Sequence, residues 1–158
     1  MTRVGITGHQ GLQSSTRHLV TRALDQALLP FGAVEGITSL AEGADQLFAE
    51  LVLDLGGKLT VIVPCAHYED SFETNIGRSS YQRLRARAAQ VVELPYDAPS
   101  EQAYWAAGQR VVDLAEILLA VWDGKPSGGL GGTADVVDYA STLGVPVRVI
   151  WPAGANRT

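Results

Sequence analysis

The sequence is poor in sulfur, with one cysteine, Cys65, and one methionine among 158 residues. A single cysteine has no partner for an internal disulfide, which fits a reducing compartment. No apolar run approaches the ~20 residues that a membrane-spanning helix needs. A strand-like pattern begins at once, with Val4 and Gly5, which leaves no room for a signal peptide. We therefore expect a cytoplasmic protein that does not contact a membrane.

Basic residues are also scarce. Lys and Arg number 12 against 17 Asp and Glu, which gives a formal net charge of −5 and an isoelectric point near 5.1. An acidic surface is poorly suited to the phosphate backbone of nucleic acids, so we do not expect nucleic acid as a partner. The hydrophobic fraction of 46% is that of a globular protein, and the length predicts one domain over residues 1–158.

Apolar residues follow strand spacing and helix spacing in alternation. Strands are predicted over 4–7, 33–38, 59–63, 91–94, 117–122 and 145–151, and helices over 14–28, 44–55, 80–89, 100–115 and 133–143. This alternation predicts an α/β fold, a three-layer, doubly wound, mostly parallel and Rossmann-like sheet of about six strands. We predict the strand order 3-2-1-4-5-6. The irregular stretch 65–79 is long enough to be functional.

The most informative stretch follows the strand predicted over 117–122. Gly128, Gly129, Gly131 and Gly132 occur within five residues, and a predicted helix starts at Thr133. Glycines let the backbone approach a ligand closely, first-turn amides have no intrahelical partner, and the helix dipole favours an anion. The stretch therefore predicts a phosphate- or carboxylate-binding loop. The alternative is that these glycines only make tight turns.

Other nucleotide and metal signatures are missing. Gly5, Gly8 and Gly11 are spaced as GxxGxxG and not as GxGxxG, and no acidic residue ends the second predicted strand, which disfavours a classical NAD site. The sequence GxxxxGK[ST] does not occur, which excludes an ATPase phosphate loop. The three histidines lack HxxxH spacing and a cysteine cluster, so we expect neither a metal nor a cofactor.

Several side chains fall at the carboxyl ends of the predicted strands, where open α/β sheets bind ligands. His9 is either a hydrogen-bonding partner of a ligand or a structural residue. Asp123 follows a buried strand and is a candidate for contact with a sugar hydroxyl. Asp45 and Asp135 fall in first helical turns, where interaction with the helix dipole explains them. Three aromatic residues could contact a base or close over a ligand: Trp122, Tyr68 and Phe72.

Four segments together form a recognisable pattern: Gly5–His9, Glu42–Leu47, Pro64 with Tyr68 and Phe72, and Leu119–Val137. The pattern covers nearly the whole chain and resembles the SLOG superfamily. That superfamily includes the lonely-guy (LOG) cytokinin-activating enzymes, often mislabelled as lysine decarboxylases, and the DNA-processing protein A family. The resemblance implies a nucleotide or phosphorylated small molecule as partner, and a homo-oligomer, most simply a dimer. With the loop positions, it predicts these ligand-binding residues: Gly8, His9, Gly43, Ala44, Asp123, Gly129, Gly131, Gly132 and Thr133.

The hydrolases of this superfamily carry a PGGxGTxxE motif whose final glutamate acts in cleaving a base from ribose 5′-phosphate. Aligning its GT on Gly132 and Thr133 places Val136 at that glutamate, and valine is neither acid nor base. The remaining catalytic candidates are Asp135, Glu42 and Arg85, with Arg83 as an alternative to Arg85 for the arginine of the middle helix.

The leading hypothesis is therefore nucleotide binding in a sensor or carrier role. Two alternatives stay open. One is a LOG-like phosphoribohydrolase acting on a nucleoside 5′-monophosphate. The other is a domain that binds a protein or single-stranded DNA.

Overall fold

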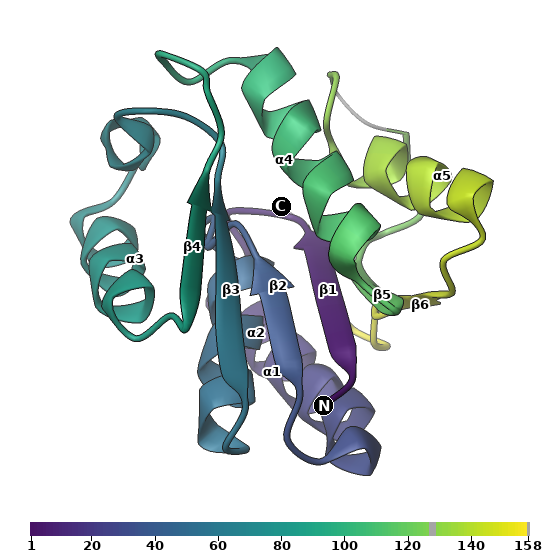
Figure 1. The fold of residues 1–158 in the computed structure, drawn as a ribbon. Helices are drawn as coiled ribbons and strands as arrows, with labels where there is room; N and C mark the ends of the chain where they lie inside the picture. The colour runs from purple at the N-terminus through teal and green to yellow at the C-terminus, as the bar shows by residue number, and fades with distance from the viewer. Residues whose placement is uncertain (127–128, 158) are drawn as a thin grey trace.

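The computed structural model describes residues 1–126 and 129–157, so the predicted loop residue Gly128 lies outside the described part. Within it, six strands form one parallel sheet in the order β4-β3-β2-β1-β5-β6 (Figure 1). The strands are β1 Arg3–Gly8, β2 Glu35–Thr38, β3 Lys58–Val63, β4 Gln90–Glu93, β5 Ile117–Val121 and β6 Val147–Val149. The helices are α1 Ser14–Leu28, α2 Ala44–Asp54, α3 Asn75–Ala86, α4 Glu101–Leu114 and α5 Thr133–Leu143, with short 3₁₀ helices η1 Leu29–Phe31 and η2 Tyr68–Ser71.

Helices cover both faces of the sheet, as the alternating pattern predicts (Figure 1). Successive strand side chains point to opposite faces, so the sheet contributes to two apolar cores. One core joins the sheet to α1, α2 and α3 and includes Leu24 and Phe48. The other joins it to α4 and α5 and includes Ile62 and Leu118. The predicted three-layer α/β architecture is confirmed.

The predicted strand order 3-2-1-4-5-6 is wrong for β4. This strand pairs with β3 at the edge of the sheet, and β5 takes the place beside β1. The exposure of Gln90, Val91 and Glu93 suits an edge, whereas Leu118–Val121 of β5 is fully buried. Strand placement therefore reverses between β1 and β5, and the carboxyl ends of these two strands form the switch point where such sheets bind ligands.

Helix ends follow the predicted caps in some places and depart from them in others. Ser100 caps α4 by accepting a hydrogen bond from the Ala103 amide at 3.0 Å, and Gly144 ends α5 with a φ of 75°, both as predicted. By contrast, α3 begins at Asn75, earlier than predicted, because Thr74 caps it. No helix in residues 1–126 and 129–157 has both the length and the apolar character to cross a membrane.

Candidate functional site

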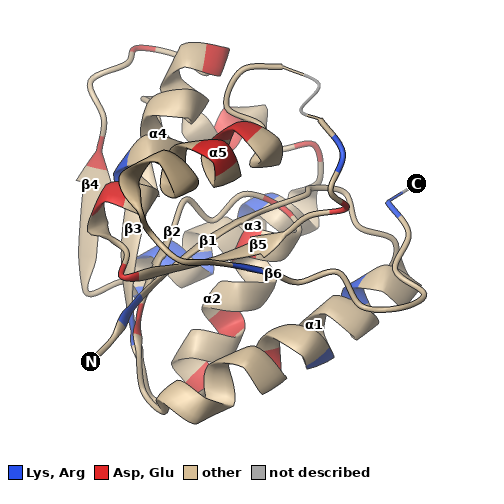
Figure 2. Ribbon diagram, turned by 90° about the vertical axis from the view of Figure 1, so that its right-hand side faces the viewer, with Lys and Arg blue, Asp and Glu red and all other residues tan. Residues whose placement is uncertain are grey.

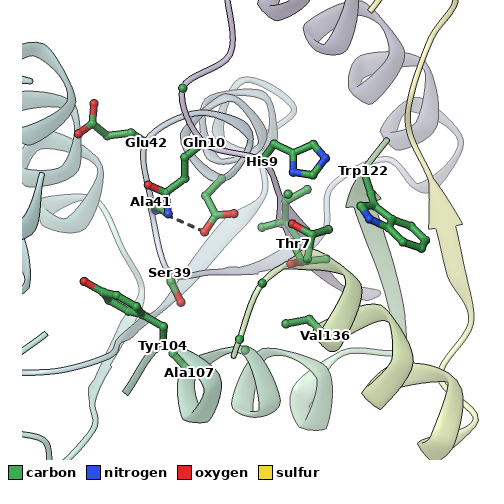
Figure 3. Close-up of a pocket in the computed structure, with 18 of the residues that line it drawn as sticks. Thr7, His9, Gln10, Ser39, Ala41, Glu42, Tyr104, Ala107, Trp122 and Val136 are labelled. Carbon is green, nitrogen blue, oxygen red and sulfur yellow. Dashed lines mark hydrogen bonds between the residues drawn. The ribbon is translucent and has the colours of Figure 1, made fainter. Parts of the chain in front are cut away.

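A cavity of about 580 Å³ opens at the carboxyl edge of the sheet. Its walls come from the loops after β1, β2, β3 and β5, from one side of α4, from the first turn of α5 and from Arg157. Figure 3 shows lining residues from the loops after β1, β2 and β5 and from α4 and α5. This volume falls within the roughly 300–1,000 Å³ of typical small-molecule sites. The loop after β4 does not contribute among the described residues, because β4 lies at the edge of the sheet.

The loop after β1 packs tightly against the N-terminus of α2. A Cβ atom on Gly8 would lie 2.6 Å from the Cβ of Ala44, and one on Gly43 would lie 2.6 Å from the carbonyl oxygen of His9. Gly43 also has a φ of +94°, which favours glycine. The Ala44 amide donates to the His9 carbonyl at 3.2 Å. Glycine is therefore needed at both positions for packing, and the Ala44 amide is already used within the protein.

His9 is held at the cavity wall with its ring 4% exposed. Its Nε2 accepts a hydrogen bond from the Asp123 amide at 3.0 Å, and its ring meets that of Trp151 edge to face. Burial first, and then the charge of Arg157, lower the pKa of His9, against the opposing effect of the Asp123 carboxylate. The lowered pKa makes the imidazole neutral near pH 7. Its Nε2 also lies 3.3 Å from Oδ1 of Asp123, and His9 lines the cavity, where it can contact a ligand.

Asp123 itself holds the loop after β5. Its Oδ1 accepts from the Lys125 amide at 3.0 Å, and the Lys125 carbonyl accepts from Nε1 of Trp122 at 2.8 Å. Burial alone would raise the pKa of the Asp123 carboxyl, but the hydrogen bond from the Lys125 amide, the contact with the His9 side chain and the charge of Arg157 outweigh it and lower this pKa. Asp123 is a negatively charged residue that positions His9 and this loop.

Two amides of the glycine-rich loop are used within the loop and α5. The Gly131 amide donates to Oδ2 of Asp135 at 3.0 Å, and the Gly132 amide donates to the Gly129 carbonyl at 3.4 Å. Gly131 has a φ of +83°, and a Cβ there would lie 2.9 Å from the backbone nitrogen of Trp105. These glycines let the loop approach α4 closely. Fewer amides of this loop are therefore available to an anion than the run of glycines predicted.

The first turn of α5 supplies the remaining donors. The amides of Thr133 and Ala134 have no intrahelical acceptor, and both residues line the cavity. The Thr133 side chain is 9% exposed and lies at the cavity wall. The first turn of α5 thus brings two backbone donors and one hydroxyl to the cavity wall, at the positive end of a helix dipole.

The predicted catalytic candidates have other contacts. The two carboxylate oxygens of Glu42 accept from the Glu73 amide and from the Thr74 hydroxyl, both at 2.7 Å, so this side chain supports the start of α3. Arg85 donates to the Tyr81 hydroxyl at 2.9 Å and lines a separate, smaller cavity. Val136, at the position of the family glutamate, is buried, and a Cβ on Gly108 would lie 2.8 Å from one of its methyl groups.

Asp45 is a cavity residue whose role the sequence did not indicate. Its carboxylate is 8% exposed and accepts from the Ala41 amide at 3.3 Å, marked by the dashed line in Figure 3. Burial raises the pKa of Asp45 to about 7, and hydrogen bonds from Ala41, Ser39 and Thr38 oppose this shift. Position in a first helical turn predicted a dipole interaction, and only the fold reveals the burial.

Aromatic side chains stand on two sides of the cavity. Tyr68 and Phe72 are buried and meet edge to face with ring centroids 5.1 Å apart, and Tyr104 lies 6.4 Å from Tyr68. Figure 3 shows Trp122 on one side and Tyr104 with Glu42 on the other. The predicted closing residues thus form part of a packed wall.

The structure brings together about half of the predicted ligand-binding residues. Those that line the cavity are Gly8, His9, Gly131, Gly132 and Thr133. Those that do not line it, among the described residues, are Gly43, Ala44, Asp123 and Gly129. Lys125 and Arg157 line it without having been predicted, and nothing in the pattern near Arg157 indicated this. In the described part of the chain, no group of three or more His, Cys, Asp or Glu residues could hold a metal ion.

Comparison with known proteins supports the fold. No protein-family model and no curated protein matches the sequence. The fold is similar to that of DNA processing protein A from Helicobacter pylori, with a TM-score of 0.71, 17% identity, and coverage of 98% of this chain and 68% of that chain. It is also similar to the molybdenum cofactor binding protein from Rippkaea orientalis, with a TM-score of 0.60, 14% identity, and 94% and 75% coverage.

A third similar structure is the structural-genomics target TM1055, with a TM-score of 0.60, 19% identity, and coverage of 93% of this chain and 72% of that chain. At these identities the likeness concerns the fold alone. The predicted Rossmann-like fold is confirmed, and these similar structures agree with the predicted resemblance to the SLOG superfamily in fold.

Proposed function

We propose that the chain binds a nucleotide or a nucleotide-derived phosphorylated ligand in the cavity, with a phosphate on the first turn of α5. One observation carries the proposal: the amides of Thr133 and Ala134 and the nearly buried Thr133 hydroxyl line a cavity of nucleotide size. Helix N-termini bind phosphate through such donors. His9 adds an uncharged polar side chain from the facing loop.

The other side of the cavity suits the base. Tyr68 and Tyr104 offer aromatic surface, and the Asp45 carboxyl offers a partner for an amino group. The ligand would then lie across the ends of β1 and β2, with its phosphate toward β5.

A sensor or carrier role agrees with these features better than base release from a nucleotide. Glu42, Asp135 and Arg85 each hold part of the protein in place, and Val136 supplies no acid or base. The Rippkaea orientalis protein binds a molybdenum cofactor, which supports ligand binding by this fold. A homodimer remains a prediction.

Single-stranded DNA is the second candidate ligand. DNA processing protein A from Helicobacter pylori binds single-stranded DNA, so the fold gives no support to the expectation, drawn from net charge, that nucleic acid is not a partner. An oligonucleotide therefore belongs in the same ligand panel.

A thermal-shift panel of AMP, ADP, ADP-ribose, cyclic nucleotides and an oligonucleotide tests the proposal. A ligand at about 100 times its Kd stabilises the folded state by about 2.7 kcal/mol. We expect such a shift with at least one nucleotide. We expect Thr133→Val to reduce it, while Thr142→Val, at the exposed far end of α5, leaves it unchanged. The proposal fails if no nucleotide stabilises the protein, and release of free base from AMP would revive the hydrolase.

A further inference from the structure

Charge is unevenly distributed around the cavity. The cationic residues that line it are Lys125, in the loop after β5, and Arg157, near the C-terminus. The anionic residues that line it, Glu42, Asp45 and Glu73, all come from the loops after β2 and β3 or from the start of α2. In Figure 2 the basic positions of the β5 loop and of the C-terminal segment lie at the same corner of the molecule.

Arg157 reaches the cavity because its segment is anchored to α1. The Thr16 hydroxyl donates to the Asn156 carbonyl at 2.8 Å, and the Asn156 amide donates back to the same hydroxyl oxygen at 2.9 Å. Thr16 is fully buried, so this pair is shielded from water. Trp151 packs edge to face on His9 and fixes the start of the same segment. Two contacts thus hold the backbone on either side of residues 152–155.

The guanidinium of Arg157 is held only loosely. Its Nη1 lies 4.0 Å from Oδ2 of Asp123, at the limit of an ion pair, and the side chain is half exposed. Lys125 lines the same end of the cavity. Lys125 and Arg157 supply two positive charges here, against the carboxylates of Asp123 and, in the first turn of α5, of Asp135.

The first turn of α5 does not by itself match the charge of a phosphate ester. Asp135 lies in that turn and its carboxylate bonds the Gly131 amide, so a negative charge already offsets part of the helix dipole. The buried Thr133 and His9 side chains are uncharged, so they add polar contacts but no positive charge. The positive charge for a multiply charged ligand must come from Lys125 and Arg157.

We propose that the cavity selects a ligand with two linked anionic groups, of the nucleoside diphosphate class, with one group on the first turn of α5 and the second bound by Arg157. This inference rests on the proposed function and specifies its ligand class. A guanidinium presents two parallel N–H donors to a phosphate, so Arg157 exchanges its loose contact with Asp123 for a bidentate one. Lys125 adds a point charge beside it.

Calorimetric titration with AMP and with ADP tests the inference. The proteins compared are the wild type, Arg157→Gln and a control, Arg148→Gln, which changes a residue of β6 away from the cavity. We expect the wild type to bind ADP about 10-fold tighter than AMP. Arg157→Gln should lose about 10-fold in ADP affinity and less than about 3-fold in AMP affinity, while Arg148→Gln matches the wild type. Thr16→Val, checked for folding by its melting temperature, should show the same selective loss as Arg157→Gln, and Thr16→Ser should not.

The outcomes separate the two proposals. Two results would overturn the proposal that Arg157 binds a second anionic group and would leave nucleotide binding intact. One is equal affinity of the wild type for AMP and ADP, and the other is an equal loss of affinity for both ligands in Arg157→Gln. Absence of binding by AMP, ADP and every other member of the nucleotide panel overturns both.

Discussion

The first turns of α2 and α5 have similar sequences, but their backbone amides have different surroundings. Gly43–Asp45 and Gly132–Asp135 each place a glycine before the helix and an aspartate in its first turn, at the same edge of the sheet. At α2 the Ala44 amide is bonded to the His9 carbonyl and Asp45 is buried. At α5 the Thr133 and Ala134 amides line the cavity. Within residues 1–126 and 129–157, one helix N-terminus is closed by the His9 carbonyl, whereas the other lies at the cavity wall.

The difference shows that a glycine before a helix has two uses. At Gly43 it lets the loop after β1 come close enough to occupy the helix N-terminus, whereas at Gly131 it lets the described part of the loop after β5 pack on α4. The aspartates in the two first turns also differ in their surroundings. Asp45 is buried with a raised pKa, and Asp135 folds back onto its own loop. Each prediction below changes one side of this comparison.

The largest expected effect is on the pH dependence of stability through Asp45. Because its pKa in the folded state is about 7 and its ordinary value is 3.8, the folded protein holds this proton more tightly than the unfolded chain. The free energy of unfolding should therefore fall as pH rises from about 4 to about 7, by up to about 4 kcal/mol from this group. Asp45→Asn should remove that fall.

Urea denaturation between pH 4 and pH 8 measures this effect as the difference between wild type and variant, which cancels the other titrating groups. Asp54→Asn, at the exposed end of α2, is the matched control and should run parallel to the wild type. A constant difference between Asp45→Asn and the wild type across this range would contradict the prediction.

Gly43→Ala should come next, with a loss of about 3 kcal/mol in the free energy of unfolding. The added methyl group would meet the His9 carbonyl, and alanine is strained at a φ of +94°. Gly56→Ala shares the strain, at a φ of +79°, but has open space around it, so it should lose only about 1 kcal/mol. Equal losses in the two variants would show that the α2 N-terminus is not tightly closed.

Asp135→Asn should have a smaller and favourable effect on ligand binding. The amide oxygen can still accept from the Gly131 amide, while the negative charge at the open helix N-terminus is removed. Affinity for ADP should rise by up to about 5-fold, measured by calorimetry. Asp138→Asn, three residues further along α5 and exposed, should change it little. A fall in affinity would mean that Asp135 contacts the ligand directly.

Much of the fold could be predicted from the sequence because apolar spacing and caps are local. The helix starting at Thr133 and its C-terminal Gly144 follow directly from residue pattern. The place of β4 in the sheet could not be predicted, since local sequence does not say which strand lies at the edge of the sheet. The contact that closes the N-terminus of α2 is made by His9, and the contact that brings Arg157 to the cavity is made by Thr16. Both residues lie far away in the sequence from the segments that they hold.

The most direct test is the backbone amide NMR spectrum of the protein titrated with ADP. The account predicts that the amide signals of Thr133 and Ala134 shift most, because a phosphate binds them, and that the Ala44 signal shifts little, because its amide remains bonded to His9. Larger shifts at Ala44 than at Thr133 and Ala134 would contradict the distinction between an open and a closed helix N-terminus.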